Sequence, residues 1–196
     1  MESPSATKFP WSTLDVDPTA FGGPYPPHQT MGKTYDYAGP NSVRQIPGDR
    51  LADFEPDFHT VMIEAKSKLL DLIPSSPLPS YGLIVSERFR RLLEGFKLPP
   101  HRYYPLPMEH RRQPIAGYFW LHLPQPTPEW EATLSITQIE QSILADPALR
   151  ELDLLPVYRP VRFGYHFLSR PLRQAIEQAN LQGIRFGTAK LFRTAR

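Results

Sequence analysis

The chain has 196 residues with no cysteine, 24 prolines and a formal net charge of +2. The absence of cysteine excludes disulfide scaffolds, zinc ribbons, iron–sulfur sites and thiol nucleophiles. Hydrophobic residues make up 40% of the chain, which is enough to fill a core despite the prolines. The N-terminus has no secretory pattern, and no apolar run approaches the roughly 20 residues that span a bilayer. We therefore expect a globular cytoplasmic protein.

Charge is distributed unevenly along the chain. Residues 1–80 contain six basic and ten acidic residues, whereas residues 150–196 contain nine basic and three acidic residues. We interpret the C-terminal arginines as solvated or ion-paired surface residues, because the near-neutral chain lacks the uniform basic character typical of nucleic-acid binders. A small nucleic-acid footprint at the C-terminal end remains an alternative.

Residues 1–57 hold nine prolines and five glycines, which interrupt regular elements. The same segment carries seven aromatic residues, which disordered tails usually lack. These are Phe9, Trp11, Phe21, Tyr25, Tyr35, Tyr37 and Phe54. We therefore predict an irregular N-terminal segment packed on the core, with loose residues at 1–7 and a short strand near Trp11–Val16.

From Phe58 onward the patterns predict regular elements. The first half is expected to contain a strand at Phe58–Glu64, a short helix at Ala65–Leu72 that turns Leu69, Leu70 and Leu72 inward, and strands at Leu83–Val85, Arg102–Leu106 and Ile115–Leu123. Directly after the strand Leu83–Val85, Ser86 is placed to cap a helix whose apolar residues lie on one face. The run Ile115–Leu123 is almost wholly apolar and aromatic, which is typical of a central strand covered on both faces.

The second half of the chain is also expected to alternate short strands and helices. The expected elements are a helix at Ser135–Ala145, strands at Asp153–Tyr158 and Tyr165–Leu168, a helix from Ser169 to about Asn180, and a strand at Ile184–Phe186. Pro156 moves its strand toward a sheet edge, and Pro171 fits the first turn of its helix. Gly183 suits the turn before the last strand.

The two serine-capped helices belong to an internal repeat. Residues 85–103 align without gaps on residues 168–186, with identities at five positions. The identical pairs are Ser86/Ser169, Arg90/Arg173, Glu94/Glu177, Leu98/Leu181 and Arg102/Arg185. Each copy has the order strand, serine cap, helix, short loop and strand. The repeat predicts an α+β fold in which two or three helices pack on a small mixed or antiparallel sheet.

The sequence contains no glycine-rich phosphate loop, no H-E-x-x-H and no G-x-S-x-G, and its six histidines are scattered. We interpret Glu94 and Glu177 as ion-pair partners of Arg90 and Arg173 rather than as paired catalytic carboxylates. We expect no enzymatic activity, no cofactor and no metal. A dispersed Glu/His enzyme site is the alternative.

Two surface regions are candidates for binding. The basic and aromatic residues at 101–104 and 110–112 suggest a nucleic-acid groove, but at least one tyrosine of the predicted strand must point into the core. The second region combines carboxylates and tyrosines on an ordered loop, a good anchor for a basic protein partner. Its candidate partner-binding residues are Tyr35, Asp36, Tyr37, Asp49, Asp53, Glu55 and Asp57.

Several of these segments resemble a known family. The run Gly82–Glu94 looks like a strand–Ser-Glu-Arg–helix signature, and Phe167–Ser169 with Gly183–Phe186 looks like a strand–serine–helix–Gly-x-x-Phe ending. Strands at Tyr118–Leu123 and Leu154–Arg159 fall where that family has strands. The chain thus resembles, over about residues 58–190, the bacterial polymorphic-toxin immunity family of the myxobacterial immunity-domain type, the eleventh in the usual numbering.

The resemblance implies a function and a division of the chain. Members are small cytoplasmic proteins, encoded beside a secreted toxin, that bind and neutralise it in type VI secretion or contact-dependent competition. It implies no catalytic residue. We therefore expect an immunity-like α+β domain at 58–196, preceded by the irregular segment 1–57, that occludes the active site of a cognate toxin domain. No nucleic acid and no membrane are expected as partners, and the oligomeric state stays open.

Overall fold

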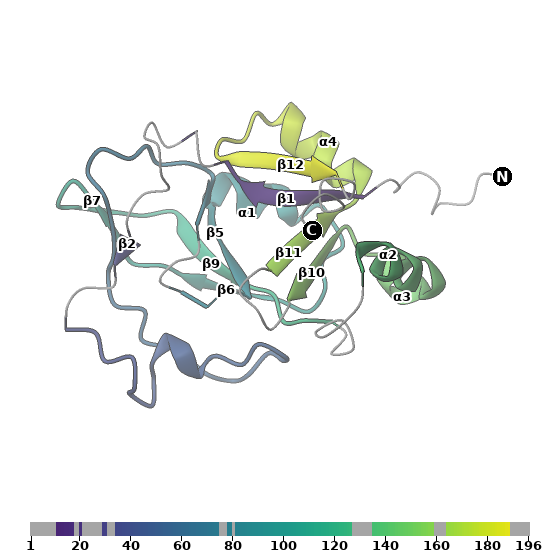
Figure 1. The fold of residues 1–196 in the computed structure, drawn as a ribbon. Helices are drawn as coiled ribbons and strands as arrows, with labels where there is room; N and C mark the ends of the chain where they lie inside the picture. The colour runs from purple at the N-terminus through teal and green to yellow at the C-terminus, as the bar shows by residue number, and fades with distance from the viewer. Residues whose placement is uncertain are drawn as a thin grey trace.

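The computed structural model describes residues 11–17, 20, 29–30, 34–74, 78–79, 81–126, 135–158 and 164–188, and these residues form an α+β protein as the sequence predicted (Figure 1). The strands are β1 (Ser12–Val16), β2 (Gln29–Thr30), β3 (Val61–Ile63), β4 (Leu72–Ile73), β5 (Gly82–Ser86), β6 (Arg102–Pro105), β7 (Met108–His110), β8 (Gln113–Ile115), β9 (Tyr118–His122), β10 (Leu154–Tyr158), β11 (Gly164–Leu168) and β12 (Ile184–Thr188). The helices are α1 (Glu87–Leu93), α2 (Ile136–Ala145), α3 (Pro147–Arg150) and α4 (Arg170–Gln178), and a 3₁₀ turn, η1, lies at Val43–Gln45.

One antiparallel sheet has the strand order β4-β5-β9-β6, and α1 follows β5 directly. Within it, Val85 of β5 lies opposite Leu72 of β4 and Phe119 of β9. The predicted central strand is therefore confirmed, but it begins later than expected. Gly117 takes a φ of +81°, which ends the extended run, and Ile115 belongs to β8.

A second antiparallel sheet has the order β10-β11-β1-β12, and α4 follows β11 directly. Here Leu168 of β11 lies opposite Leu154 of β10 and Ser12 of β1. Figure 1 shows β1, in purple, between β11 and the yellow β12. The N-terminal strand thus takes the place in this sheet that β9 takes in the first.

The predicted internal repeat is confirmed, and it is larger than the sequence suggested. Each unit is a four-stranded sheet with one serine-capped helix, and the strand registers correspond position by position. Ser86 and Ser169 each accept a hydrogen bond from a backbone N–H three residues later, at 3.2 and 3.3 Å. α1 and α4 pack against each other. The inner strand of the second unit comes from the start of the chain, outside the aligned residues.

The two units share one hydrophobic core. It combines side chains at equivalent places in both sheets and both helices: Leu72 with Leu154, Val85 with Leu168, Phe89 with Leu172, Leu93 with Ile176, and Leu121 with Leu14. All of these are buried. Burying an aliphatic or aromatic side chain contributes about 1.5–3 kcal/mol, so this shared cluster is a principal source of stability.

The outer faces of the two sheets are covered differently. Trp120 and Ile84 of the first sheet pack under residues from the segment 43–63. Phe167 of the second sheet packs under α2 and α3 instead. The third sheet, β2-β3-β7-β8, joins the first of these outer cores through Val61, Ile63 and Met108. The loops that carry Val43, Ile46 and Phe58 are thereby held on the first unit.

The expected helix at Ala65–Leu72 is wrong. Residues 64–67 form a turn, in which the Ser67 N–H donates to the Glu64 carbonyl at 3.0 Å, and Leu72 then enters β4. Leu69 is 39% exposed rather than turned inward. Pairing of Leu72 and Ile73 with β5 prevails over the local helix pattern, because it buries both side chains completely or nearly so.

Candidate functional site

The seven predicted partner-binding residues lie on the loops before β3. Tyr35 and Tyr37 are half-buried, and the five acidic residues are exposed. Figure 1 shows this segment in blue, running along one side of the molecule with η1 in it. Val43 and Ile46 of the same loops are buried, whereas residues 1–10, 18–19, 21–28 and 31–33 of the expected N-terminal segment lie outside the described residues.

Tyr35 fixes the geometry of these loops. Its hydroxyl donates to the Asp57 carbonyl oxygen at 2.6 Å and accepts from the Val43 N–H at 2.8 Å. Its ring meets the Tyr37 ring edge to face, with centroids 4.7 Å apart. One phenol therefore links two chain segments that lie 22 residues apart in the sequence.

Asp36 and Asp57 are brought together by this arrangement. The Asp36 Oδ1 accepts from the Ala38 N–H at 2.9 Å, and the Asp57 Oδ1 accepts from the His59 N–H at 3.0 Å. The Asp57 N–H donates to the Asn41 carbonyl at 2.8 Å, which holds the two loops side by side. Neither carboxylate forms an ion pair within the part of the chain that the structure describes.

Two neighbouring hollows surround Asp57 and His59. The larger, about 440 Å³, is lined by Glu55, Pro56, Asp57, Phe58, His59, Thr60, Tyr104, Pro105 and Pro107. The smaller, about 280 Å³, is lined by Thr34, Tyr35, Asp36, Gly39, Pro40, Asn41, Ser42, Asp57 and His59. Asp57 and His59 line both hollows and form their shared wall. We call this surface the acidic face.

The acidic face contains four of the seven predicted residues as lining. Asp49 and Asp53 do not line either hollow, and Tyr37 lies beside the smaller one through its contact with Tyr35. Asp49 pairs with Arg50 at 3.6 Å. Twelve further residues line the hollows, among them His59 and Tyr104, which were not predicted as partner-binding residues. Nothing in the local pattern marks His59, whereas Tyr104 belongs to the basic and aromatic cluster that the sequence placed in another candidate surface.

Two arginines already lie over tyrosines at the edges of this face. The Arg44 guanidinium lies 4.6 Å from the centroid of Tyr37, and the Arg102 guanidinium lies 4.7 Å from the centroid of Tyr104. Arg102 also forms an ion pair with Glu55. Because Glu55 is thus neutralised, Asp57 is the unpaired carboxylate of the larger hollow.

The acidic face is not arranged as a Glu/His catalytic site. The His59 imidazole contacts the Tyr35 ring, with centroids 5.9 Å apart, and only the His59 backbone N–H bonds to a carboxylate. Within the residues described above, no hydrogen bond joins this imidazole to Glu55 or Asp57. A general base acting with a carboxylate requires such a contact, directly or through one water.

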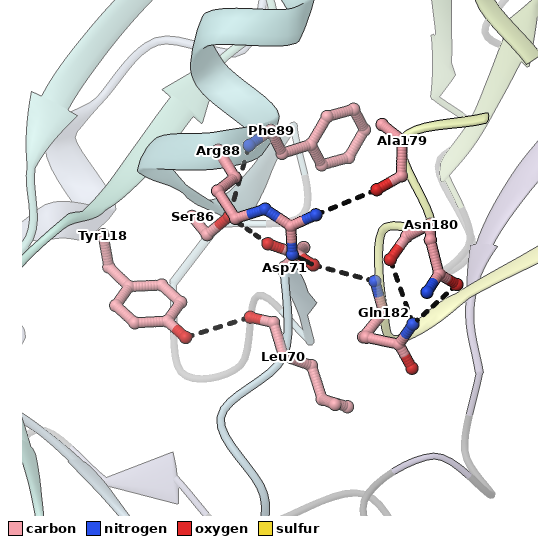
Figure 2. Close-up of polar contacts among 9 residues, drawn as sticks. All are labelled: Leu70, Asp71, Ser86, Arg88, Phe89, Tyr118, Ala179, Asn180 and Gln182. Atoms are coloured by element: carbon pink, nitrogen blue, oxygen red, sulfur yellow. Dashed lines mark hydrogen bonds and ion pairs between the residues drawn. The ribbon is translucent and has the colours of Figure 1, made fainter. Parts of the chain in front are cut away.

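A second polar cluster joins the two units of the repeat (Figure 2). The Ser86 hydroxyl donates to the Asp71 Oδ1 at 2.6 Å while it accepts from the Phe89 N–H. The other Asp71 oxygen accepts from the Gln182 N–H at 2.8 Å, across from the second unit. Asp71 is buried, so these donors replace the water that its carboxylate loses.

Arg88 and Tyr118 complete this cluster. The Arg88 guanidinium reaches between Asp71, at 3.3 Å, and the Ala179 carbonyl at the end of α4, at 2.9 Å (Figure 2). The Tyr118 hydroxyl donates to the Leu70 carbonyl at 3.0 Å. Burial, together with the Asp71 charge, raises the pKa of Tyr118 to about 12. Tyr118 therefore acts as a neutral hydrogen-bond donor.

The second unit repeats the serine–aspartate part of this cluster, with the roles of the two units exchanged. The Ser169 hydroxyl donates to the Asp153 Oδ1 at 2.6 Å, and the Asp153 Oδ2 accepts from the Lys97 N–H, in the loop after α1, at 3.0 Å. Each aspartate thus binds its own cap serine and the loop of the other unit. Each serine is buried and its hydroxyl donates to a buried carboxylate, so each pair fixes the helix cap to the residue before its neighbouring strand.

The remaining sequence candidates are ion pairs, as interpreted. Glu94 binds Arg90 at 2.7 Å and Glu177 binds Arg173 at 2.8 Å. In the C-terminal part, Arg185 pairs with Asp15 at 2.6 Å. The basic residues at 159, 162, 190, 193 and 196 lie outside the described residues.

The chain matches no protein-family model and shows no significant similarity to a curated protein. In the described ranges, no group of three or more His, Asp or Glu side chains is placed to hold a metal ion. Of the helices that the structure describes, none is long and apolar enough to cross a membrane.

Proposed function

We propose that this chain is a cytoplasmic immunity protein that binds a secreted antibacterial toxin through the acidic face and covers the toxin's active site. The observation that carries the proposal is the pair of hollows that meet at Asp57 and His59. The face combines exposed carboxylates, half-buried tyrosines and concave shape, which together favour a basic protein partner. The resemblance of residues 82–94 and 167–186 to the immunity family supports a toxin as that partner.

The charge on this face is available to a partner. Of the carboxylates that line the two hollows, Asp36 and Asp57 form no ion pair with any described residue, whereas Glu55 pairs with Arg102. Unpaired carboxylates attract a basic surface and raise the association rate, most strongly at low salt. A toxin that acts on nucleic acid or another anionic substrate would present such a surface at its active site. A standard interface of about 800 Å² per partner is enough to cover it.

Co-expression with the toxin encoded beside this gene tests the proposal. Cells that express the toxin alone are expected to die, and cells that also express this chain are expected to grow, with the two proteins co-purifying as a complex. Toxin killing that this chain does not reduce, together with no complex between purified proteins, would overturn the proposal.

Charge-neutral variants test whether the acidic face is the interface. In the double variant Asp36→Asn/Asp57→Asn, the remaining amide oxygen still accepts the local N–H, so the loops keep their hydrogen bonds. We expect weaker protection and a slower association rate. The matched control is Glu64→Gln/Glu109→Gln, which removes two charges that line neither hollow and is expected to protect fully.

A further inference from the structure

The strand β12 forms one edge of the second sheet. Among the described strands it pairs with β1 alone (Figure 1). The Asp17 N–H donates to the Gly183 carbonyl oxygen at 2.9 Å, which continues the register of these two strands. Because opposite residues of an antiparallel pair alternate between bonded and non-bonded, Arg185 and Gly187 also bond toward β1. The backbone groups that point away from β1 are those of Ile184, Phe186 and Thr188.

The equivalent edge of the first sheet carries a proline. β6 lies at this edge, and the Leu106 N–H donates to the Tyr118 carbonyl oxygen of β9 at 3.0 Å. The same alternation directs the backbone of Pro105 away from β9. Pro105 has no N–H, so a further strand could not complete a ladder along β6. In the repeat, Pro105 corresponds to Thr188, two positions after the last aligned pair.

The opposite edges of both sheets, β4 and β10, carry prolines at equivalent places. The N–H of each cap serine donates to the carbonyl of the aspartate before the edge strand, at 2.8 and 2.9 Å. With the registers of β4 and β10, these bonds direct Pro74 and Pro156 outward. Prolines at such positions prevent a sheet edge from pairing with another chain. Of the four edges of the repeat sheets, β12 alone keeps an N–H at every outward-facing position.

The edge of β12 is complementary to a second copy of itself. Antiparallel pairing about a two-fold axis at Phe186 places Ile184 opposite Thr188 of the second copy, so every outward-facing backbone group is bonded. This register places Arg185 opposite Gly187 of the second copy, so no like charges meet. An axis at Arg185 would instead set two arginines opposite each other, which is unfavourable. The half-buried Phe186 would lie opposite its own copy as a cross-strand aromatic pair.

From these observations we infer that two copies of the chain associate through β12 and form one continuous sheet of eight strands, four from each copy. Because the edge is short, we expect a weak dimer with a dissociation constant of about 1–100 μM. The residues of this edge line neither hollow of the acidic face. The inference therefore goes beyond the proposed function and does not depend on it.

Sedimentation velocity of the full chain, between about 1 and 300 μM, tests the association. We expect the mass to rise from one chain to two across this range. Thr188→Pro gives β12 the proline that β6 has, and it removes an N–H that points away from β1. We expect this variant to weaken the dimer at least about tenfold, because the two-fold axis makes it lose two backbone hydrogen bonds. Thr188→Val keeps the N–H and is the matched control, expected to form dimers as the original chain does.

Disulfide trapping tests the register, since the chain has no cysteine of its own. In Phe186→Cys the two introduced thiols lie opposite each other across the axis, within the Cα separation that a disulfide requires. In Arg185→Cys they lie diagonally, beyond that separation. Under mild oxidation we expect Phe186→Cys to form covalent dimers at least about fivefold faster than Arg185→Cys. Unchanged thermal unfolding of each variant shows that the fold is preserved.

Several outcomes would overturn the inference. A chain that stays monomeric throughout the concentration range has no such interface. Equal dimerisation of Thr188→Pro and Thr188→Val would show that the copies meet elsewhere, and equal trapping of the two cysteine variants would exclude the register. None of these results bears on protection against a toxin, so failure of the dimer and failure of the proposed function are separately visible.

Discussion

Removal of either cap serine is expected to destabilise the protein far more than loss of an ordinary helix cap. Ser86→Ala and Ser169→Ala each delete a hydroxyl that caps a helix and also donates to a buried carboxylate at 2.6 Å. Loss of a serine cap costs about 1 kcal/mol. Leaving a buried acceptor without its donor costs about 1–3 kcal/mol more. We therefore expect each variant to lose about 2–4 kcal/mol of unfolding free energy.

The third serine-capped helix supplies the control. Ser135 caps α2 in a capping box with Gln138, but its side chain is exposed and has no carboxylate behind it. Ser135→Ala is expected to cost only about 1 kcal/mol. Urea denaturation followed by circular dichroism and tryptophan fluorescence measures all three variants, and equal slopes against urea show that the unfolded states are comparable.

The comparison can refute the reasoning in two ways. If Ser86→Ala and Ser169→Ala cost no more than Ser135→Ala, the hydrogen bonds to Asp71 and Asp153 do not contribute to stability. If the first two variants differ from each other by more than about 2 kcal/mol, the two aspartate–serine pairs are not energetically equivalent, and the shared geometry of the repeat does not extend to its energetics.

Three further predictions concern acidity, packing and the acidic face. Burial lowers the pKa values of His122 and His166 to about 4, so the unfolded chain binds more protons than the folded chain between about pH 6.5 and 4. The unfolding free energy should therefore decrease as the pH is lowered through this window, by up to about 1.4 kcal/mol per pH unit for each histidine. Urea titrations at pH 7, 6 and 5 check this, and equal stabilities would contradict it. Gly82→Ala would drive its Cβ into the indole ring of Trp120 and should lower the unfolding free energy by more than about 2 kcal/mol in the same assay. The control is Gly95→Ala, whose Cβ would lie 3.5 Å from its nearest neighbour and which should change the unfolding free energy by less than about 0.5 kcal/mol. Tyr35→Phe removes the hydroxyl that holds η1, so the amide at the start of η1 should exchange its hydrogen about fivefold faster, and unchanged exchange would show that the loops are held by other contacts.

The elements that the sequence predicts well are those defined by neighbouring residues. Ser86 and Ser169 each cap a helix as expected, because a cap is a contact between residues three apart. Ser135, where a helix was expected to begin, caps α2 in the same way. Gly183 takes a φ of +84° in the turn before β12, also as expected. The ion pairs of the repeated helices follow from their four-residue spacing.

The pairing of β1 and the assembly of the acidic face could not be predicted from the sequence, because both depend on contacts between residues far apart in the chain. β1 pairs with β11 and β12, more than 150 residues away, and nothing in residues 12–16 specifies those partners. The same holds for the acidic face, where Tyr104 meets the loop of Asp57 only after the first sheet has formed. Asp71 and Asp153 carried a usable signal, since each comes directly before a strand and 15 or 16 residues before its cap serine.

The repeat also explains why the acidic face occurs on one unit alone. The inner faces of both sheets pack against each other and against α1 and α4, so their side chains are constrained in pairs and stay similar. The outer faces have no such mutual constraint, and their residues differ: Trp120 in the first sheet corresponds to Thr13 in the second, and Tyr104 corresponds to Gly187. Large rings on the first outer face hold the segment 34–63, which carries the unpaired carboxylates. The second outer face is closed by α2 and α3, so the two similar halves form the scaffold and the difference between their outer faces places the acidic face on the first unit.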